Sequence, residues 1–292
     1  MKMFTSFLTR PIEEDEPTAH KIRQLEAVVP GGIRLGVDLV QKYGANANVR
    51  GGLKDAYEHL APIIDTDTAM MYLLSLVVKK GATLHKREIH GDLRPQEQEL
   101  FATYKANAIV NASGVGAADL ASDGDVLPVR GALLRAVNDG SCFPKIDNAM
   151  IVSAETRADG RHESMAFVVP RTDDILVMGS IEQPRETQLD LTPDSEAVRK
   201  IRERCEQLLP ALREAKLDPA YPLAQGLRPY RTTRLRVERE NSSVPLGGGG
   251  GDGDRSASCI VHCYGHGGGG WSTAFGASRE CARLVDQVIK EK

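Results

Sequence analysis

Residues 262–272 read His-Cys-Tyr-Gly-His-Gly-Gly-Gly-Gly-Trp-Ser, and this stretch decides how the C-terminal part of the chain is expected to fold. It joins an apolar run that ends at Val261 to a segment of helical spacing that begins near Ser272. Successive glycines carry no Cβ, so their backbone N–H groups can approach a flat or anionic ligand closely. A helix that starts here directs the positive end of its dipole to the same place. The pattern predicts a ligand cradle, although a glycine run is also typical of a flexible loop, as we expect for residues 247–251.

Composition and charge exclude several classes of protein. The net charge of −3 gives no electrostatic footprint for nucleic acid. No apolar run reaches the roughly 18 residues that a membrane-spanning helix needs, so we expect no membrane partner. The N-terminal residues lack a secretory pattern, and five scattered cysteines favour reduced thiols. We therefore expect an intracellular protein, cytoplasmic or peroxisomal, although its end, Lys290-Glu291-Lys292, is not a Ser-Lys-Leu type signal.

The histidines and cysteines near the glycine run do not predict a metal site. His262, Cys263 and His266 are of ligand type, but their spacing matches no standard zinc pattern. Cys259 and Cys263 fall on the same side of a strand, which favours a place in the core over redox chemistry.

The first part of the chain predicts a loop followed by a helix. Residues 11–20 are acidic and contain two prolines, which favours a loop or strap. A helix capped by Asp65 or Thr66 follows, and its apolar spacing places Met70 and Met71 in the core.

Two strands are predicted next, at residues 83–89 and 107–111. The second leads into a turn of small residues at 112–116. A helix followed by a strand, and a strand followed by a glycine turn, indicate an α/β fold.

From residue 129 onward the pattern changes to that of a largely antiparallel sheet. Short segments bounded by Gly, Asp or Pro are rich in β-branched residues and predict strands at 132–137, 150–154, 165–169 and 175–181. An amphipathic helix is expected at 195–209, capped by Thr192 or Asp194, with Val198, Ile201, Cys205 and Leu208 along one stripe.

The chain is expected to end with a strand at 258–261 and a long helix. Ser272 or Thr273 is the natural cap of that helix. Its apolar spacing predicts that it buries Phe275, Cys281, Leu284, Val285 and Val288.

Arg228 is the residue most suited to bind an anionic group. It lies in Gln225-Gly226-Leu227-Arg228-Pro229, where Pro229 favours an extended backbone at Arg228. A guanidinium fixed in this way can hold a carboxylate through two parallel hydrogen bonds. The alternative is a solvated arginine or a surface ion pair with Glu238 or Glu240.

Several motifs in one consistent order resemble the D-amino-acid oxidase family. The resemblance runs from about Ile64 to Val288. It is carried by Val110-Asn111-Ala112-Ser113-Gly114-Val115, Pro128-Val129-Arg130-Gly131, Gly226-Leu227-Arg228-Pro229, Arg236-Val237-Glu238-Arg239-Glu240 and Val261-His262-Cys263-Tyr264-Gly265-His266-Gly267-Gly268, and more loosely by Phe167-Val168-Val169-Pro170 and Val177-Met178-Gly179-Ser180.

The resemblance implies an FAD-dependent enzyme that oxidises a D-amino acid to the imino acid, which hydrolyses to the 2-oxo acid and ammonia, while dioxygen becomes hydrogen peroxide. It implies that Arg228 holds the substrate carboxylate and that Gly268 offers its carbonyl to the amine. We consider a homodimer as its assembly. The implied FAD contacts are Ile89, Ser113, Gly267, Gly268, Gly269, Gly270, Trp271 and Ser272.

Two features depart from the family pattern. No Gly-x-Gly-x-x-Gly turn follows an early strand, so the chain is expected to be shortened by about a hundred residues and to lack the unit that binds the FAD pyrophosphate. A tyrosine of the family's substrate site is replaced by Phe167, and its partner position falls near Glu163. Phe167 keeps the ring but loses a hydrogen bond to a charged group, a cost of about 1.5–3 kcal/mol in binding.

The expected fold is therefore α/β (α+β). A truncated, Rossmann-like FAD-binding subdomain, residues 1–128 and 258–292, is interleaved with an antiparallel substrate-binding subdomain, residues 129–257. Two other interpretations remain open: a catalytically impaired family member that acts as a binding module or has no separate function, and a flavin oxidoreductase for another amine in a biosynthetic pathway.

Overall fold

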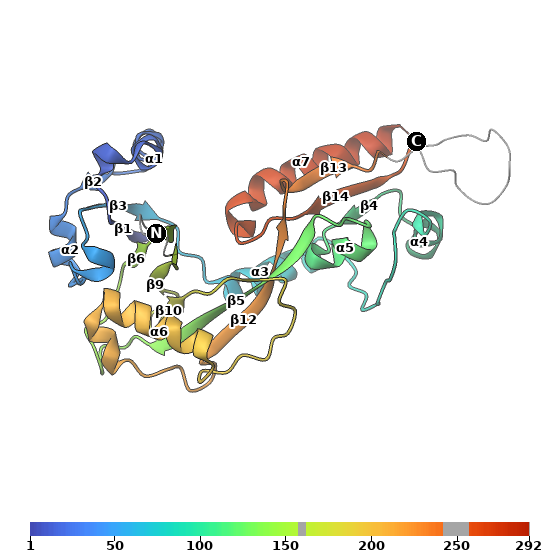
Figure 1. Cartoon of the computed structure of the whole chain (residues 1–292). Helices are drawn as coiled ribbons and strands as arrows, with labels where there is room; N and C mark the ends of the chain where they lie inside the picture. The colour runs from blue at the N-terminus through green and yellow to red at the C-terminus, as the bar shows by residue number, and fades with distance from the viewer. Residues whose placement is uncertain (157–161, 242–256, 292) are drawn as a thin grey trace. The chain divides into compact units, whose positions relative to one another are not determined.

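The computed structural model describes residues 1–156, 162–241 and 257–291, and it has the mixed α/β fold that the sequence predicts (Figure 1). The glycine run at 247–251 and the side chain of Glu163 lie outside the described part of the chain. The chain forms two compact units. The first comprises Met1–Leu84, Gly131–Glu182 and Leu189–Gly226, and the second His85–Arg130, Gln183–Gln188 and Leu227–Lys292.

A large sheet makes up most of the first unit, while its strand β11, residues 126–130 of β5 and residues 227–231 of β12 belong to the second unit. Its strand order is β11-β5-β10-β9-β6-β1-β3-β2, and β12 also pairs with β5. β1 and β6 are parallel, whereas β9 and β10 are antiparallel to each other. A separate pair consists of β7 (Glu155–Thr156) and β8 (His162–Glu163). The strands of the large sheet are β1 (Lys2–Leu8), β2 (Arg34–Leu35), β3 (Asp55–Ala61), β5 (Val126–Val137), β6 (Ala149–Val152), β9 (Ala166–Pro170), β10 (Ile175–Gly179), β11 (Gln183–Pro184) and β12 (Leu223–Arg231).

Helix α6 (Glu196–Leu208) covers strands of this sheet, as its apolar stripe predicts. Val198, Ile201, Cys205 and Leu208 are fully buried, and the Cys205 thiol lies 3.5 Å from the carbonyl oxygen of a β9 residue. The N-cap is Ser195 rather than Thr192 or Asp194. The other helices of this unit are α1 (Glu16–Glu26), α2 (Asp38–Lys42) and α3 (Thr66–Lys79), and 3₁₀ turns lie at Ile12–Glu14, Val49–Gly51 and Pro210–Glu214.

The second unit has a three-stranded sheet in the order β13-β14-β4. β14 is antiparallel to β13 and parallel to β4. Helix α7 packs on this sheet, and Val261, Cys281 and Val288 belong to one buried cluster. The elements are α4 (Glu97–Tyr104), β4 (Ile109–Asn111), a 3₁₀ turn (Gly114–Gly116), α5 (Ala117–Leu120), β13 (Arg236–Arg239), β14 (Ile260–Tyr264) and α7 (Gly270–Lys290).

Two predicted local structures are wrong. The acidic segment at 11–20 contains the start of helix α1, because Asp15 accepts a hydrogen bond from the backbone N–H of Thr18 and a proline in the first turn loses no helical hydrogen bond. The strand predicted at 83–89 does not form, since its charged side chains are mostly exposed and no neighbouring strand pairs with it among the described residues.

Three residues predicted to lie in the core are exposed. Met70 and Met71 on α3 are 58% and 73% exposed, and Phe275 on α7 is 84% exposed. The cap of α3 is as predicted, because Asp65 accepts from the backbone N–H of Asp67. Helical spacing therefore predicted the position of α3 correctly, but it did not predict that the apolar face of this helix is exposed.

The division into units differs from the predicted subdomain boundaries. Residues 1–128 were expected to form part of one subdomain, but Met1–Leu84 group with the large sheet. The cause is β1, which lies between β6 and β3 and so belongs to the sheet of the first unit. Among the helices of the described residues, none is long and apolar enough to span a membrane.

Candidate functional site

The glycine turn joins β14 to α7, as the sequence predicts, but the helix begins earlier than expected. Its N-cap is Gly269 rather than Ser272 or Thr273. No side chain caps the first turn, and the Thr273 hydroxyl instead donates to the carbonyl of Gly269. The N–H groups at the positive end of the α7 dipole are therefore not occupied by a side-chain cap.

The end of β12 runs antiparallel beside this turn. The N–H of Gly267 donates to the carbonyl of Pro229 at 2.9 Å, and Tyr230 forms an antiparallel bridge with His266. The register therefore places Arg228 opposite Gly268. We call the four pairs 231/265, 230/266, 229/267 and 228/268 the turn ladder.

The Arg228 side chain lies beside Gly268, in the space that a side chain at position 268 would use. A Cβ built on Gly268 would lie 3.6 Å from Cδ and 3.7 Å from Nε of Arg228. A Cβ on Gly270 would meet no atom within 4 Å, so the turn is open at the start of the helix. Arg228, which is predicted to bind the substrate, and Gly268, which is predicted to bind substrate and cofactor, therefore lie side by side.

A second group of predicted cofactor residues lines a pocket along β4. Ile89 and Ser113 both line this pocket, whose volume is about 510 Å³. Its other walls are mainly apolar and include Leu93, Leu100 and Leu120. None of the glycines of the turn lines it.

The two groups of residues follow neighbouring strands. Since β4 and β14 are parallel, the turns after them leave from the same edge of the sheet. A Cβ on Gly114, the residue after Ser113, would lie 3.7 Å from Pro229. In open α/β sheets ligands bind outside the carboxyl ends of parallel strands, which is where both turns lie.

Phe167 belongs to the first unit and lies on β9. Its ring packs across Gly179 of β10, where a Cβ would lie 2.2 Å from the ring carbon Cζ. A side chain at position 179 would clash with the Phe167 ring, so glycine is needed there. The spacing of the two residues along the sequence did not indicate this contact.

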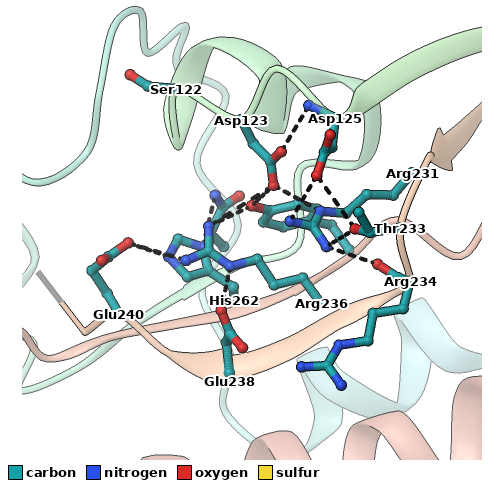
Figure 2. A network of polar contacts seen from close by, with 12 residues as sticks. Ser122, Asp123, Asp125, Arg231, Thr233, Arg234, Arg236, Glu238, Glu240 and His262 are labelled. Atoms are coloured by element: carbon teal, nitrogen blue, oxygen red, sulfur yellow. Dashed lines mark hydrogen bonds and ion pairs between the residues drawn. The ribbon is translucent and has the colours of Figure 1, made fainter.

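A buried polar network supports the strands that lead into the turn (Figure 2). One carboxylate oxygen of Asp123, Oδ2, accepts from the Tyr264 hydroxyl at 2.8 Å and from Arg231 Nε at 2.9 Å. Arg236 on β13 donates to the Tyr264 hydroxyl at 2.8 Å. Asp123 and Tyr264 are 9% and 1% exposed.

Burial and hydrogen bonding set the charges in this network. Burial raises the pKa of Tyr264 to about 12, so its hydroxyl stays protonated and donates. Burial alone would also raise the pKa of Asp123, but the hydrogen bonds from Tyr264 and Arg231 outweigh it and lower the pKa below its usual value. Asp123 is therefore a buried carboxylate anion.

His262 extends the network towards Ser113. Asn111 Oδ1 accepts from the backbone N–H and the hydroxyl of Ser113, so its amide nitrogen faces His262 Nδ1 at 3.4 Å. His262 Nδ1 must then be the acceptor, and Nε2 donates to Glu240 at 3.0 Å. Burial lowers the pKa of His262, which agrees with this neutral tautomer.

The sequence offered little indication of this network. Asp123-Gly124-Asp125 has the composition of an ordinary turn, and the arginines after Tyr230 resemble a solvated surface. Asp123, Arg231 and Tyr264 come together because the chain changes its neighbouring strand after β14. Strand β14 pairs with β13, whereas the turn that follows it runs beside the end of β12.

Comparison with known proteins defines the class. Residues 12–284 match the model of the FAD dependent oxidoreductase family (DAO). The chain therefore belongs to this family.

Within the family, its curated relatives include D-amino-acid oxidases, which confirms the predicted resemblance. The chain is 32% identical over 239 residues to the D-amino-acid oxidase of Rubrobacter xylanophilus, covering 82% of this chain and 62% of that protein. It is 31% identical over 185 residues to the human D-aspartate oxidase, covering 62% of this chain and 44% of that protein. The chain thus spans less than two thirds of the length of these relatives.

Solved structures show the same fold. The crystal structure of glycine oxidase from Geobacillus kaustophilus superposes with a TM-score of 0.69 at 15% identity, and the match covers 98% of this chain and 71% of that one. L-proline dehydrogenase from P. horikoshii gives a TM-score of 0.65 at 14% identity, covering 98% and 72%. At these identities the likeness is one of fold alone.

Proposed function

We propose that this chain provides the substrate-carboxylate site and part of the flavin site of an FAD-dependent oxidase acting on a D-amino acid. The observation that carries the proposal is the position of the Arg228 side chain beside Gly268, where it lies within 3.6 Å of the place a Cβ would take, at the open start of α7. The family and the D-amino-acid oxidase relatives support it.

The residues present fit a flavin at the glycine turn. Gly268 and Gly270 leave the backbone accessible, and a Cβ at Gly268 would contact Arg228. Residues 267–272 would line the flavin, while Ile89 and Ser113 would contact the cofactor from the pocket along β4. FAD, when bound, accepts the hydride from the substrate Cα and passes two electrons to dioxygen.

The chain's own residues bind and orient the substrate. Arg228 would hold the carboxylate with two parallel hydrogen bonds, which fixes orientation as well as charge. The carbonyl of Gly268 would accept from the substrate amine, and Phe167 would offer a ring without a hydroxyl. The N-terminal end of α7 would stabilise negative charge on a reduced flavin by about 0.3–2 kcal/mol. The imino acid formed would hydrolyse to the 2-oxo acid and ammonia.

The first test is reconstitution of the purified chain with FAD, followed by its visible spectrum. We expect a flavin band, and peroxide release with a D-amino acid. A panel of D-amino acids, cyclic imino acids and N-methyl amines would identify the substrate and separate this function from oxidation of another amine. Absence of flavin after reconstitution would contradict the proposal and favour an impaired family member that acts as a binding module.

The second test is Arg228→Ala in the reconstituted protein. Removing the guanidinium should raise KM for the amino acid about 100-fold, since a charge-assisted bidentate contact to the carboxylate is lost. Arg234→Ala is the matched control, because Arg234 is exposed and follows six residues later. An unchanged KM in Arg228→Ala would remove Arg228 from the carboxylate role.

Assembly and location form part of the proposal. A homodimer is proposed and is tested by sedimentation of the purified chain. An intracellular compartment, cytoplasmic or peroxisomal, is proposed from the cysteine content and is tested by cell fractionation.

A further inference from the structure

Polar side chains outside the turn ladder hold its 231/265 end. At the 228/268 end, the Arg228 side chain lies beside Gly268. At the 231/265 end, Arg231 and Tyr264, the residue before Gly265, both donate to Oδ2 of Asp123. Asp123 therefore joins the end of β12 to the end of β14.

The contact at this end of the ladder is close. A Cβ on Gly265 would lie 2.9 Å from Cβ of Arg231, and Gly265 has a φ of +84° that disfavours other residues. The Arg231 side chain therefore occupies the space that a side chain at position 265 would need. A shift of Arg231 along β12 would move every later pair of the ladder by the same amount.

The loop of Asp123 also holds the residue that follows β12. The backbone N–H of Thr232 donates to the carbonyl of Asp125 at 3.1 Å, and the Thr232 hydroxyl donates to the Asp125 carboxylate at 2.9 Å. The other oxygen of Asp123, Oδ1, accepts from the N–H of Asp125 at 3.0 Å. The buried carboxylate of Asp123 thus accepts from three donors, which belong to Arg231, Tyr264 and Asp125.

We propose that Asp123 is a positioning residue that fixes the register of the turn ladder and so places Arg228 opposite Gly268. Its part in substrate binding rests on the proposed function. Only a carboxylate satisfies all three donors, because an amide has one acceptor oxygen and its nitrogen would face an N–H or O–H donor. Asp123→Asn therefore disturbs the ladder while nearly conserving the volume of the side chain.

The test uses Trp271, the single tryptophan of the chain, which lies in the second position of α7. Its quenching by acrylamide reports access to the turn without any need for FAD. Asp123→Asn should raise the quenching constant about twofold, because a loosened turn opens to solvent. Tyr264→Phe, which removes one donor and keeps the Asp123–Arg231 ion pair, should cause a smaller rise.

Asp218→Asn is the matched control. Asp218 is 7% exposed and accepts from Arg135 Nε at 3.2 Å, so it is a comparable buried carboxylate in the first unit. It should lower the melting temperature without changing the quenching of Trp271. Unchanged quenching in folded Asp123→Asn, or an equal change in Asp218→Asn, would overturn the proposal. If Asp123→Asn does not fold, unchanged quenching in Tyr264→Phe overturns it.

A second readout connects Asp123 with the substrate. In FAD-reconstituted protein, Asp123→Asn should raise KM for the D-amino acid about tenfold with a smaller change in kcat, since misplacement of a binding group weakens orientation first. An unchanged KM would contradict the role in substrate binding. If no flavin binds, the proposed function fails, and the fluorescence of Trp271 still decides whether Asp123 sets the register.

Discussion

Helices α3 and α7 both carry apolar residues at helical spacing, yet only α7 buries any of them. In α7, Cys281 and Val288 are buried and join a cluster with Val261 of β14. In α3 no residue is buried, and Met71, near its middle, is 73% exposed. The two helices thus share a sequence pattern but differ in their surroundings.

The difference shows what helical periodicity can and cannot predict. A period of 3.6 residues determines which side chains share a face of a helix. Burial of that face requires a second surface, which for α7 is the sheet reached directly through the short glycine turn. The apolar residues of α3 instead line an open groove with a volume of about 400 Å³, formed by Met71, Leu74, Ser75, Val78, Lys79 and Leu84.

The largest expected effect comes from placing a charge on each helix. Val288→Asp should lower the free energy of unfolding of the second unit by about 4 kcal/mol, since a carboxylate at a fully buried position has no partner. Met71→Asp should change that of the first unit by no more than about 0.5 kcal/mol. Urea unfolding of both variants measures the contrast. Equal losses would show that the apolar face of α3 is covered.

Acid provides a test of the sheet that α7 covers. Burial lowers the pKa of His262, with Glu240 and Glu238 opposing and Arg236 supporting this shift. The unfolded chain therefore binds a proton that the folded chain does not, and stability falls as pH decreases below about 6.5, by at most about 1.4 kcal/mol per pH unit. His262→Gln keeps a polar group there and should remove this component from the pH dependence. An identical slope in the variant would contradict the neutral state of His262.

The two helices also differ at their N-termini. Asp65 caps α3 with its side chain, whereas Gly269 caps α7 with none. Asp65→Ala should weaken α3 by about 1 kcal/mol, because an orphan backbone N–H loses its acceptor. Hydrogen exchange of the α3 amides measures this local loss. Asp65→Asn is the control, since asparagine retains the acceptor and should protect nearly as well as the native residue.

Lowering the pH should reproduce part of the loss of hydrogen-exchange protection that Asp65→Ala causes in α3. A hydrogen bond from Thr68 lowers the pKa of Asp65, so the stabilisation it gives is present above its usual pKa near 4 and is lost as pH falls through the lowered value. Protection of α3 that does not change between pH 6 and pH 2 would contradict a contribution of the Asp65 charge to the cap, since a protonated carboxyl, like asparagine, keeps an acceptor oxygen.

The sequence predicts local features well, but it predicts poorly which residues from distant parts of the chain come together. The β14–turn–α7 unit, the cap at Asp65 and the stripe of α6 each depend on residues close together in the chain, and each is found. The predicted strand at 83–89 fails because strand formation needs a distant partner. Arg228 and Gly268 were both predicted as site residues, but their contact follows from a ladder between segments about 40 residues apart, which local pattern alone does not give.

Asp123 illustrates the same limit for polar residues. In sequence it belongs to an Asp-Gly-Asp turn, whereas in the fold it is a buried anion between two strand ends. The three donors that keep it charged come from residues 125, 231 and 264. Such a site becomes visible only when the pairing of β14 is known.

The smallest expected effect tests whether α7 is covered along its whole length. Phe275 is 84% exposed although it shares the helix with the buried Val288. Phe275→Ala should change the free energy of unfolding by no more than about 0.5 kcal/mol, because an exposed ring gives up little packing and alanine favours the helix. Val288→Ala is the matched truncation, and its loss of buried methyl groups should cost about 1–3 kcal/mol. A loss in Phe275→Ala as large as that in Val288→Ala would mean that the ring is covered, and the start of α7 would then no longer resemble the exposed face of α3.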